Sequence, residues 1–167
     1  MQDYEEYLFH QTPEILAKEL IKYVPLSSND YLLDPFKGEG SFYNNFPENI
    51  KKDWTEIREG KDYKDYDFNT NKIDWVITNP PFKIDNKHSF WLLVDFYSQK
   101  VNKGIAFLGN DTCLSSLTPI RLQILKNRGF YINKIVVCSV KKWRGRYFFI
   151  IIEKKENDFI NYLLPYY

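Results

Sequence analysis

The chain has 167 residues, 44% hydrophobic and 18% aromatic, which suits one globular catalytic domain over residues 1–167 and excludes two separately folded catalytic domains. The formal net charge of +1 excludes attraction of nucleic acid by the molecule as a whole, so any such affinity must come from local patches. Two isolated cysteines and two histidines are too few to predict a zinc site. The sequence shows neither a leader pattern nor an apolar run near ~20 residues, which predicts a cytoplasmic or otherwise intracellular protein.

The first half of the chain predicts short strands that each end at a polar residue. Thr12 as N-cap with Pro13 in the first turn predicts a helix that ends near Val24. A buried strand over residues 31–33 stops at Asp34, and a glycine-containing turn then leads to a helix that begins at Ser41. The next strands are predicted over residues 54–57 and 73–78.

The second half continues the alternation of helix and strand and then changes character. Helices are predicted over residues 90–97 and 120–125, with a buried strand over 104–108 between them. Two β-rich runs, residues 132–140 and 147–152, flank a short basic segment and read as an antiparallel hairpin. The sequence therefore predicts an α/β fold with a mostly parallel sheet and a C-terminal antiparallel hairpin.

Three polar side chains are predicted to converge at one edge of this sheet. Asp34, Glu56 and Asn79 each lie at or near the C-terminal end of a predicted parallel strand, where open α/β sheets bind ligands. Gly38 and Gly40 follow Asp34 and allow the backbone to approach a ligand closely, although such a loop alone is also an ordinary strand-to-helix turn. Glu56, about 20 residues later, is where nucleotide sites place an acid that binds ribose hydroxyls.

The loop chemistry favours a cationic or neutral nucleoside over a pyrophosphate. The chain has neither GxGxxG nor GxxxxGK[ST], and Glu39 sets a carboxylate between the two glycines, where phosphate would be repelled. S-adenosylmethionine fits this requirement, since its sulfonium and ammonium groups suit acidic side chains and carbonyls. No metal is required.

The sequence Asn79-Pro80-Pro81-Phe82 indicates a site for an amino group. Two prolines fix φ and remove two backbone donors, so the turn presents carbonyl acceptors beside the Asn79 side chain. Such acceptors can take both N–H bonds of an exocyclic NH₂, and Phe82 can stack on the ring that bears it. The alternative is a strand closed by a Pro-Pro turn with a core phenylalanine.

With these motifs, the sequence from about Thr12 to Ile152 resembles the class I methyltransferases, and among them the N6-adenine DNA methyltransferases, whose fold is Rossmann-like. The resemblance implies that the DPFxGxG loop and the acid Glu56 bind S-adenosylmethionine, with the helix opened by Thr12 closing over the methionine end. It implies that Asp62 and Tyr63 read the cofactor adenine, with Asp65 and Asp67 as rivals. The implied catalytic motif is Asn79, Pro80, Pro81 and Phe82, and the implied loop residues are Asp34, Pro35, Phe36, Gly38 and Gly40.

The substrate implied is DNA, favoured over RNA. A basic turn, residues 141–146, holds four cations and one tryptophan, which suits phosphate and base contacts, although a solvated turn explains it equally well. The predicted nucleic-acid contacts are Lys83, Lys141, Lys142, Trp143, Arg144 and Arg146. Methylation of RNA adenine or of a protein glutamine amide, and an inactive scaffold with this fold, stay open.

The middle of the chain is short for such a fold. Only about 15 residues separate Gly40 from Glu56, so helices that usually cover one sheet face are shortened or lost. We therefore expect a homodimer or a heteromeric partner that covers this face. No segment suits a separate target-recognition domain, so selectivity is expected from loops or from another protein.

Overall fold

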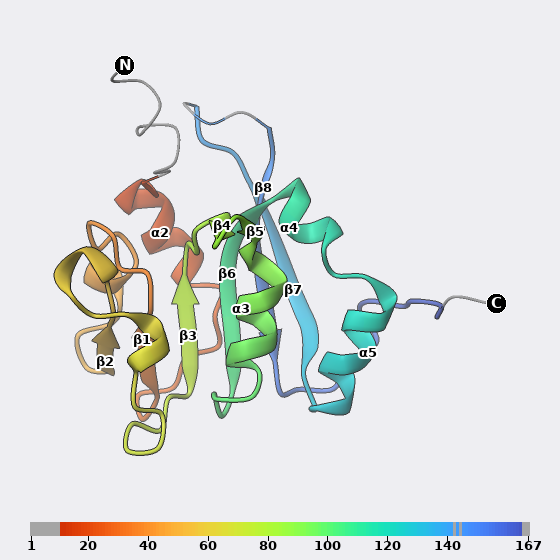
Figure 1. Cartoon of the computed structure of the whole chain (residues 1–167), viewed down its shortest axis with the longest axis horizontal. Coiled ribbons are helices and arrows are strands. Elements are labelled where there is room, and N and C mark those ends of the chain that lie inside the picture. The colour runs from red at the N-terminus through yellow and green to blue at the C-terminus, as the bar shows by residue number, and fades with distance from the viewer. Residues whose placement is uncertain (1–10, 142, 144, 165–167) are drawn as a thin grey trace.

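The computed structural model describes residues 11–141, 143 and 145–164, which build a six-stranded sheet in the order β2-β1-β3-β6-β8-β7 (Figure 1). Its strands are β1 (Tyr31–Asp34), β2 (Lys51–Trp54), β3 (Trp75–Thr78), β6 (Gly104–Asn110), β7 (Tyr131–Cys138) and β8 (Tyr147–Glu153). β2, β1, β3 and β6 run parallel, whereas β8 is antiparallel to both β6 and β7. The predicted α/β class, with a mostly parallel sheet and a C-terminal hairpin, is confirmed.

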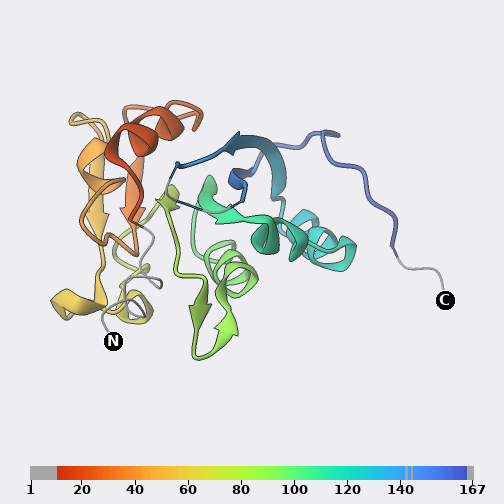
Figure 2. The same ribbon diagram turned by 90° about the horizontal axis from the view of Figure 1, so that it is seen from above.

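Helices pack on both faces of the sheet (Figure 2). They are α2 (Glu14–Ile21), α3 (Ser89–Tyr97), α4 (Asp111–Ser115) and α5 (Pro119–Asn127). Residues of α3, α4 and α5 share a core with Leu33 and Ile105, whereas residues of α2 share a second core with Leu32 and Ala106. Successive residues of one strand thus face different cores, which explains why the central strands are apolar at almost every position.

The first helix differs from its prediction at both ends. α2 ends at Ile21 rather than near Val24, and Pro13 occupies the N-cap position without a side-chain cap bond. The prediction of Thr12 as the N-cap was wrong, because its hydroxyl accepts a hydrogen bond from Asn79 at 3.1 Å instead. The Thr12 side chain therefore makes a tertiary hydrogen bond instead of the helix cap that the local sequence pattern predicted.

The second strand lies earlier than predicted. β2 spans Lys51–Trp54 rather than residues 54–57, so Glu56 lies in the loop beyond the strand. The parallel pairing of β1 with β2 ends at Asp34 and Trp54. Pro35, which follows β1, has no backbone N–H with which to continue it.

No α-helix follows the glycine loop. The helix predicted from Ser41 is replaced by a 3₁₀ turn, η1 (Tyr43–Asn45), because two asparagines and Pro47 disfavour a longer helix before β2 begins. Two further 3₁₀ turns, η2 (Ile57–Glu59) and η3 (Tyr63–Asp65), occupy the connection from β2 to β3. The predicted shortening of this half is therefore confirmed.

The sheet face beneath this shortened region is nevertheless covered, contrary to expectation. Phe42 and Phe46 are each 2% exposed, and the Phe42 ring stacks on Phe149 of β8 with centroids 5.9 Å apart. With Leu20 and Ile21 of α2, these rings bury the strand residues on that side. A partner is therefore not needed to cover this face.

Candidate active site

The carboxyl ends of β1 and β3 and the loop after β2 surround one cavity of about 290 Å³. Of the residues singled out in the sequence, those that line it are Pro35, Phe36, Gly38, Glu56, Asp62, Tyr63, Asn79, Pro80, Pro81 and Phe82. Its wall also contains Ile57, Lys64, Ile84 and Asp85, which sequence reasoning missed. The predicted convergence of Glu56 and Asn79 is therefore observed, whereas Asp34 does not line the cavity.

Asp34 ends β1 as a buried carboxyl group, 1% exposed, and it is not among the residues that line the cavity. The Thr78 hydroxyl donates to its Oδ1 at 2.6 Å and the Phe36 amide donates at 3.3 Å. Burial raises the pKa of Asp34 from 3.8 to about 7, although both hydrogen bonds favour the charged form. Asp34 thus joins the loop after β1 to the end of β3.

The two loop glycines have different roles. Gly38 has φ of +55° and lines the cavity, where its missing side chain leaves room between Gln11 and Arg58. Gly40 has φ of +95°, and a Cβ there would lie 2.6 Å from the Asn44 side chain. Gly40 is thus required for the turn and does not line the cavity.

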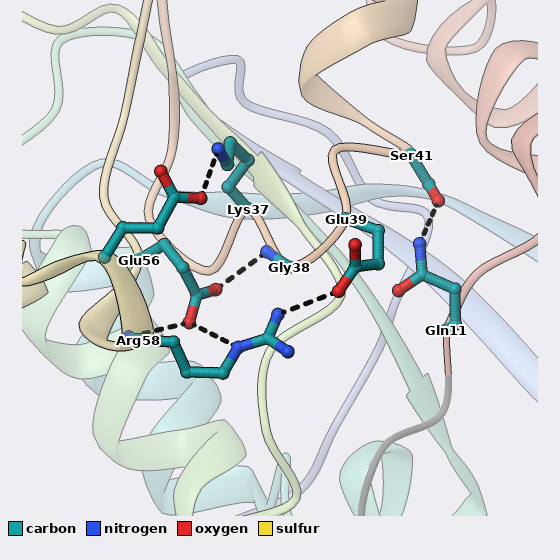
Figure 3. Close-up of polar contacts among 8 residues, drawn as sticks. Gln11, Lys37, Gly38, Glu39, Ser41, Glu56 and Arg58 are labelled. Atoms are coloured by element: carbon teal, nitrogen blue, oxygen red, sulfur yellow. Dashed lines mark hydrogen bonds and ion pairs between the residues drawn. The ribbon is translucent and has the colours of Figure 1, made fainter.

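Glu56 is held in place by three donors (Figure 3). Its Oε2 accepts from the Gly38 amide at 2.8 Å, and its Oε1 accepts from the Arg58 amide at 3.1 Å and from Arg58 Nε at 3.0 Å. Burial acts to raise the pKa of Glu56, but the bonds from Arg58 and Gly38 outweigh it, so the pKa lies below 4.5. Glu56 therefore carries a negative charge at neutral pH.

Two ion pairs that sequence reasoning missed connect the glycine loop after β1 to η2 (Figure 3). Arg58 Nη2 lies 3.4 Å from Glu39 Oε1, and Lys37 Nζ lies 2.6 Å from Glu59 Oε1. Each pair joins a residue of the glycine loop to a residue of η2 about 20 positions later, so helical or strand spacing in the sequence could not reveal it.

The structure distinguishes the three acidic candidates after Glu56. Asp62 caps η3 by accepting from the Lys64 amide at 3.0 Å, and both Asp62 and Tyr63 line the cavity. The Tyr63 ring contacts Phe36, with centroids 5.0 Å apart. Asp65 and Asp67 are exposed and do not line the cavity.

The Asn79–Phe82 turn is fastened by the first residue of α3. The Ser89 amide donates to the Phe82 carbonyl at 3.1 Å, and the Ser89 hydroxyl donates to the Pro81 carbonyl. After this turn the chain forms a two-stranded hairpin that was not predicted, β4 (Lys83–Ile84) and β5 (Lys87–His88). Its turn residues, Asp85 and Asn86, have φ of 51° and 61°, as a tight hairpin turn requires.

Thr12 lies on the other side of Asn79, beside a second cavity of about 50 Å³. Phe36, Gly38 and Asn79 line both cavities, so the two adjoin along the glycine loop. Thr12 is 4% exposed, and the sequence predicted it to be a cofactor-binding residue. The structure brings it to this smaller cavity rather than to the larger one.

The described residues of the basic turn lie between β7 and β8, at the end of the sheet where β3 and β6 also end (Figure 1). Lys141 is exposed, whereas Arg146 lies 3.3 Å from Asp111 in an exposed ion pair. The Trp143 ring is half-buried and contacts Tyr147, with centroids 4.5 Å apart. Lys142 and Arg144 lie outside the described residues.

Lys83 is exposed in β4, directly after the Asn79–Phe82 turn. In the described part of the chain, no three His, Cys, Asp or Glu side chains gather closely enough to hold a metal ion. No helix among the described residues combines the length and apolar character needed to cross a membrane.

No protein-family model matches the chain, and no curated protein matches it by sequence. Solved structures do match. A putative RNA methyltransferase from Pyrococcus horikoshii is 15% identical with a TM-score of 0.65, and the match covers 92% of each chain. A modification subunit of a putative type I restriction enzyme from Vibrio vulnificus YJ016 is 12% identical with a TM-score of 0.64, over 90% of this chain and 46% of that one.

A third match is the magnesium protoporphyrin IX methyltransferase from Synechocystis PCC 6803 with bound S-adenosylmethionine. It is 10% identical with a TM-score of 0.58, and the match covers 85% of this chain and 77% of that one. These likenesses show that the chain has the Rossmann-like fold of class I methyltransferases. The chain spans about half the length of the restriction-enzyme subunit.

Proposed function

We propose that this protein transfers a methyl group from S-adenosylmethionine to the N6 amino group of adenine in DNA. The observation that carries the proposal is the single cavity that joins the glycine loop and Glu56 to the Asn79–Phe82 turn. A cofactor site and an acceptor site for an amino group thus share one wall, which direct transfer between them requires.

The cavity suits the nucleoside part of this cofactor. The ionised Glu56 carboxylate, 6% exposed, would accept hydrogen bonds from ribose hydroxyls. Phe36, Ile57 and Tyr63 supply apolar and aromatic walls for a purine ring. When bound, the cofactor supplies an electrophilic methyl group on a positively charged sulfur.

The Asn79–Phe82 turn suits the amino group that receives the methyl. The Asn79 Oδ1 and the Pro80 carbonyl accept hydrogen bonds from the two amino N–H groups and hold the nitrogen toward the cofactor side of the cavity. Phe82 stacks on the ring that bears the amino group. Because the reaction is an in-line displacement, these residues act chiefly by orienting the nitrogen.

The nucleic-acid part of the proposal rests on the resemblance of the motifs and on the cations around the site. The described residues of the basic turn and Lys83 lie beyond the carboxyl ends of the parallel strands, as the cavity does. Cations there would contact phosphates on either side of an adenine flipped out of its stack. Loops such as β4–β5, or a partner chain, would select the target sequence.

Transfer of labelled methyl groups to DNA, RNA and protein, compared side by side, tests the function. We expect labelled N6-methyladenine in the DNA after nucleoside analysis, and its loss in Asn79→Ala. Label only in RNA adenine or in a protein glutamine would move the substrate to one of those alternatives. Cofactor binding without transfer to any of the three would favour a scaffold role.

A further inference from the structure

The hydrogen bond between Thr12 and Asn79 joins the residue before α2 to the proposed acceptor of the amino group. Asn79 Nδ2 donates to Thr12 Oγ1 at 3.1 Å across 67 residues of sequence. An asparagine amide is planar, with its nitrogen and oxygen on opposite edges. A bond that fixes the nitrogen edge therefore also fixes the direction of Oδ1.

Thr12 is itself held firmly enough to act as a reference point. Its side chain is buried at 4% exposure, and its carbonyl accepts from the Ser41 hydroxyl at 2.6 Å. Gln11 Nε2 donates to the same Ser41 oxygen at 2.7 Å (Figure 3). The segment that carries Thr12 is thus tied to the end of the glycine loop at two successive residues.

The orientation of this amide matters because its two edges have opposite hydrogen-bonding character. An exocyclic amino group offers only N–H donors to the turn, so it must meet Oδ1 of Asn79. Rotation of the amide by half a turn would face it with Nδ2 instead, donor against donor. Such a flip removes one of the two acceptors that orient the reacting nitrogen.

We propose that Thr12 is a positioning residue for methyl transfer, which selects the Asn79 rotamer that turns Oδ1 toward the amino group. This inference rests on the proposed function of the Asn79–Phe82 turn. It gives Thr12 a role beyond the contact with cofactor that the family resemblance implies. The residue acts through Asn79 and does not touch the reacting atoms.

Thr12→Val tests the role, because valine keeps the shape of threonine but loses the acceptor. We expect the single-turnover rate of methyl transfer at saturating cofactor to fall by about tenfold to hundredfold. The cofactor Kd should change by less than about threefold, since most of the cofactor wall is unaltered. Thr12→Ser keeps the hydroxyl and should restore the rate to within a few-fold of the parent.

Thr55→Val is the matched control. Thr55 is buried at 3% exposure, and its hydroxyl donates to the Pro35 carbonyl at 2.6 Å. The chemical change and the burial are the same, but the hydroxyl bonds the backbone rather than Asn79. We expect the single-turnover rate at saturating cofactor to be retained in this variant.

A second measurement does not depend on methyl transfer. Hydrogen exchange of the Asn79 side-chain amide, assigned from the signal that Asn79→Asp loses, should be faster in Thr12→Val and slow again in Thr12→Ser. An unchanged exchange rate, or a weaker cofactor Kd with an unchanged transfer rate, would overturn the proposal. If the parent protein methylates no substrate, the proposed function fails, while the exchange data still decide whether Thr12 orients the amide.

Discussion

Asp34 should give the folded protein a pH dependence that Asp34→Asn removes. The pKa of Asp34 is raised from 3.8 to about 7 by burial, so between these values the folded chain retains a proton that the unfolded chain has lost. Stability from this group is therefore fully present below about pH 4 and is lost as pH rises to about 7. At about 1.4 kcal/mol per pH unit, the change across the window is about 4 kcal/mol.

The assay is urea unfolding of the parent and of Asp34→Asn between about pH 4 and about pH 8. Asparagine keeps an oxygen that can accept from Thr78, which now donates to Asp34 at 2.6 Å, but it cannot ionise. We expect the variant to gain stability relative to the parent as pH rises. Glu56 titrates in both proteins, and because its pKa is lowered, its contribution to stability falls only as pH drops below about 4.5. This contribution therefore cancels when the unfolding free energies of the parent and the variant are subtracted. Parallel stability curves across the whole range would refute the reasoning.

Three further predictions concern the proposed activity. Asn79→Ala should lower turnover by about 10²–10³-fold, as expected for loss of a group that stabilises the transition state. The cofactor Kd measured by calorimetry should be nearly unchanged, and an equal loss of cofactor affinity would contradict this role. Glu56→Ala should weaken cofactor binding by about tenfold or more, because a charged hydrogen-bond acceptor is lost. Glu59→Ala is its control, since Glu59 pairs with Lys37 and does not line the cavity, so equal affinities of the two variants would count against the site. Replacing the four cations of the basic turn by glutamine should reduce the salt dependence of DNA binding by about one unit of slope per lost phosphate contact. Binding like that of the parent at every salt concentration would show that the turn is only a solvated surface.

The sequence alone was sufficient for the architecture and for the position of the cavity. Apolar runs that end at Asp34 and Asn79 predict parallel strands, and the carboxyl ends of parallel strands meet at one sheet edge whatever their exact bounds. This is why the shift of β2 by three residues still leaves Glu56 beside Gly38. Local chemistry also identified the Asn79–Phe82 turn, because two prolines restrict a backbone without help from distant residues.

The tertiary structure decided which side chains reach the cavity and what holds them there. Spacing along the sequence left Asp62, Asp65 and Asp67 as alternatives for the residue that reads the cofactor adenine. Only the path of the chain into η3 brings Asp62 to the wall of the cavity. The helix predicted after Thr12 forms, but Thr12 does not cap it and instead accepts a hydrogen bond from Asn79, 67 residues away. A linear pattern records the periodicity of each element but not the rotation of one element against another. The hydrogen bonds that orient the site join side chains across such elements, so they became visible only in the folded chain.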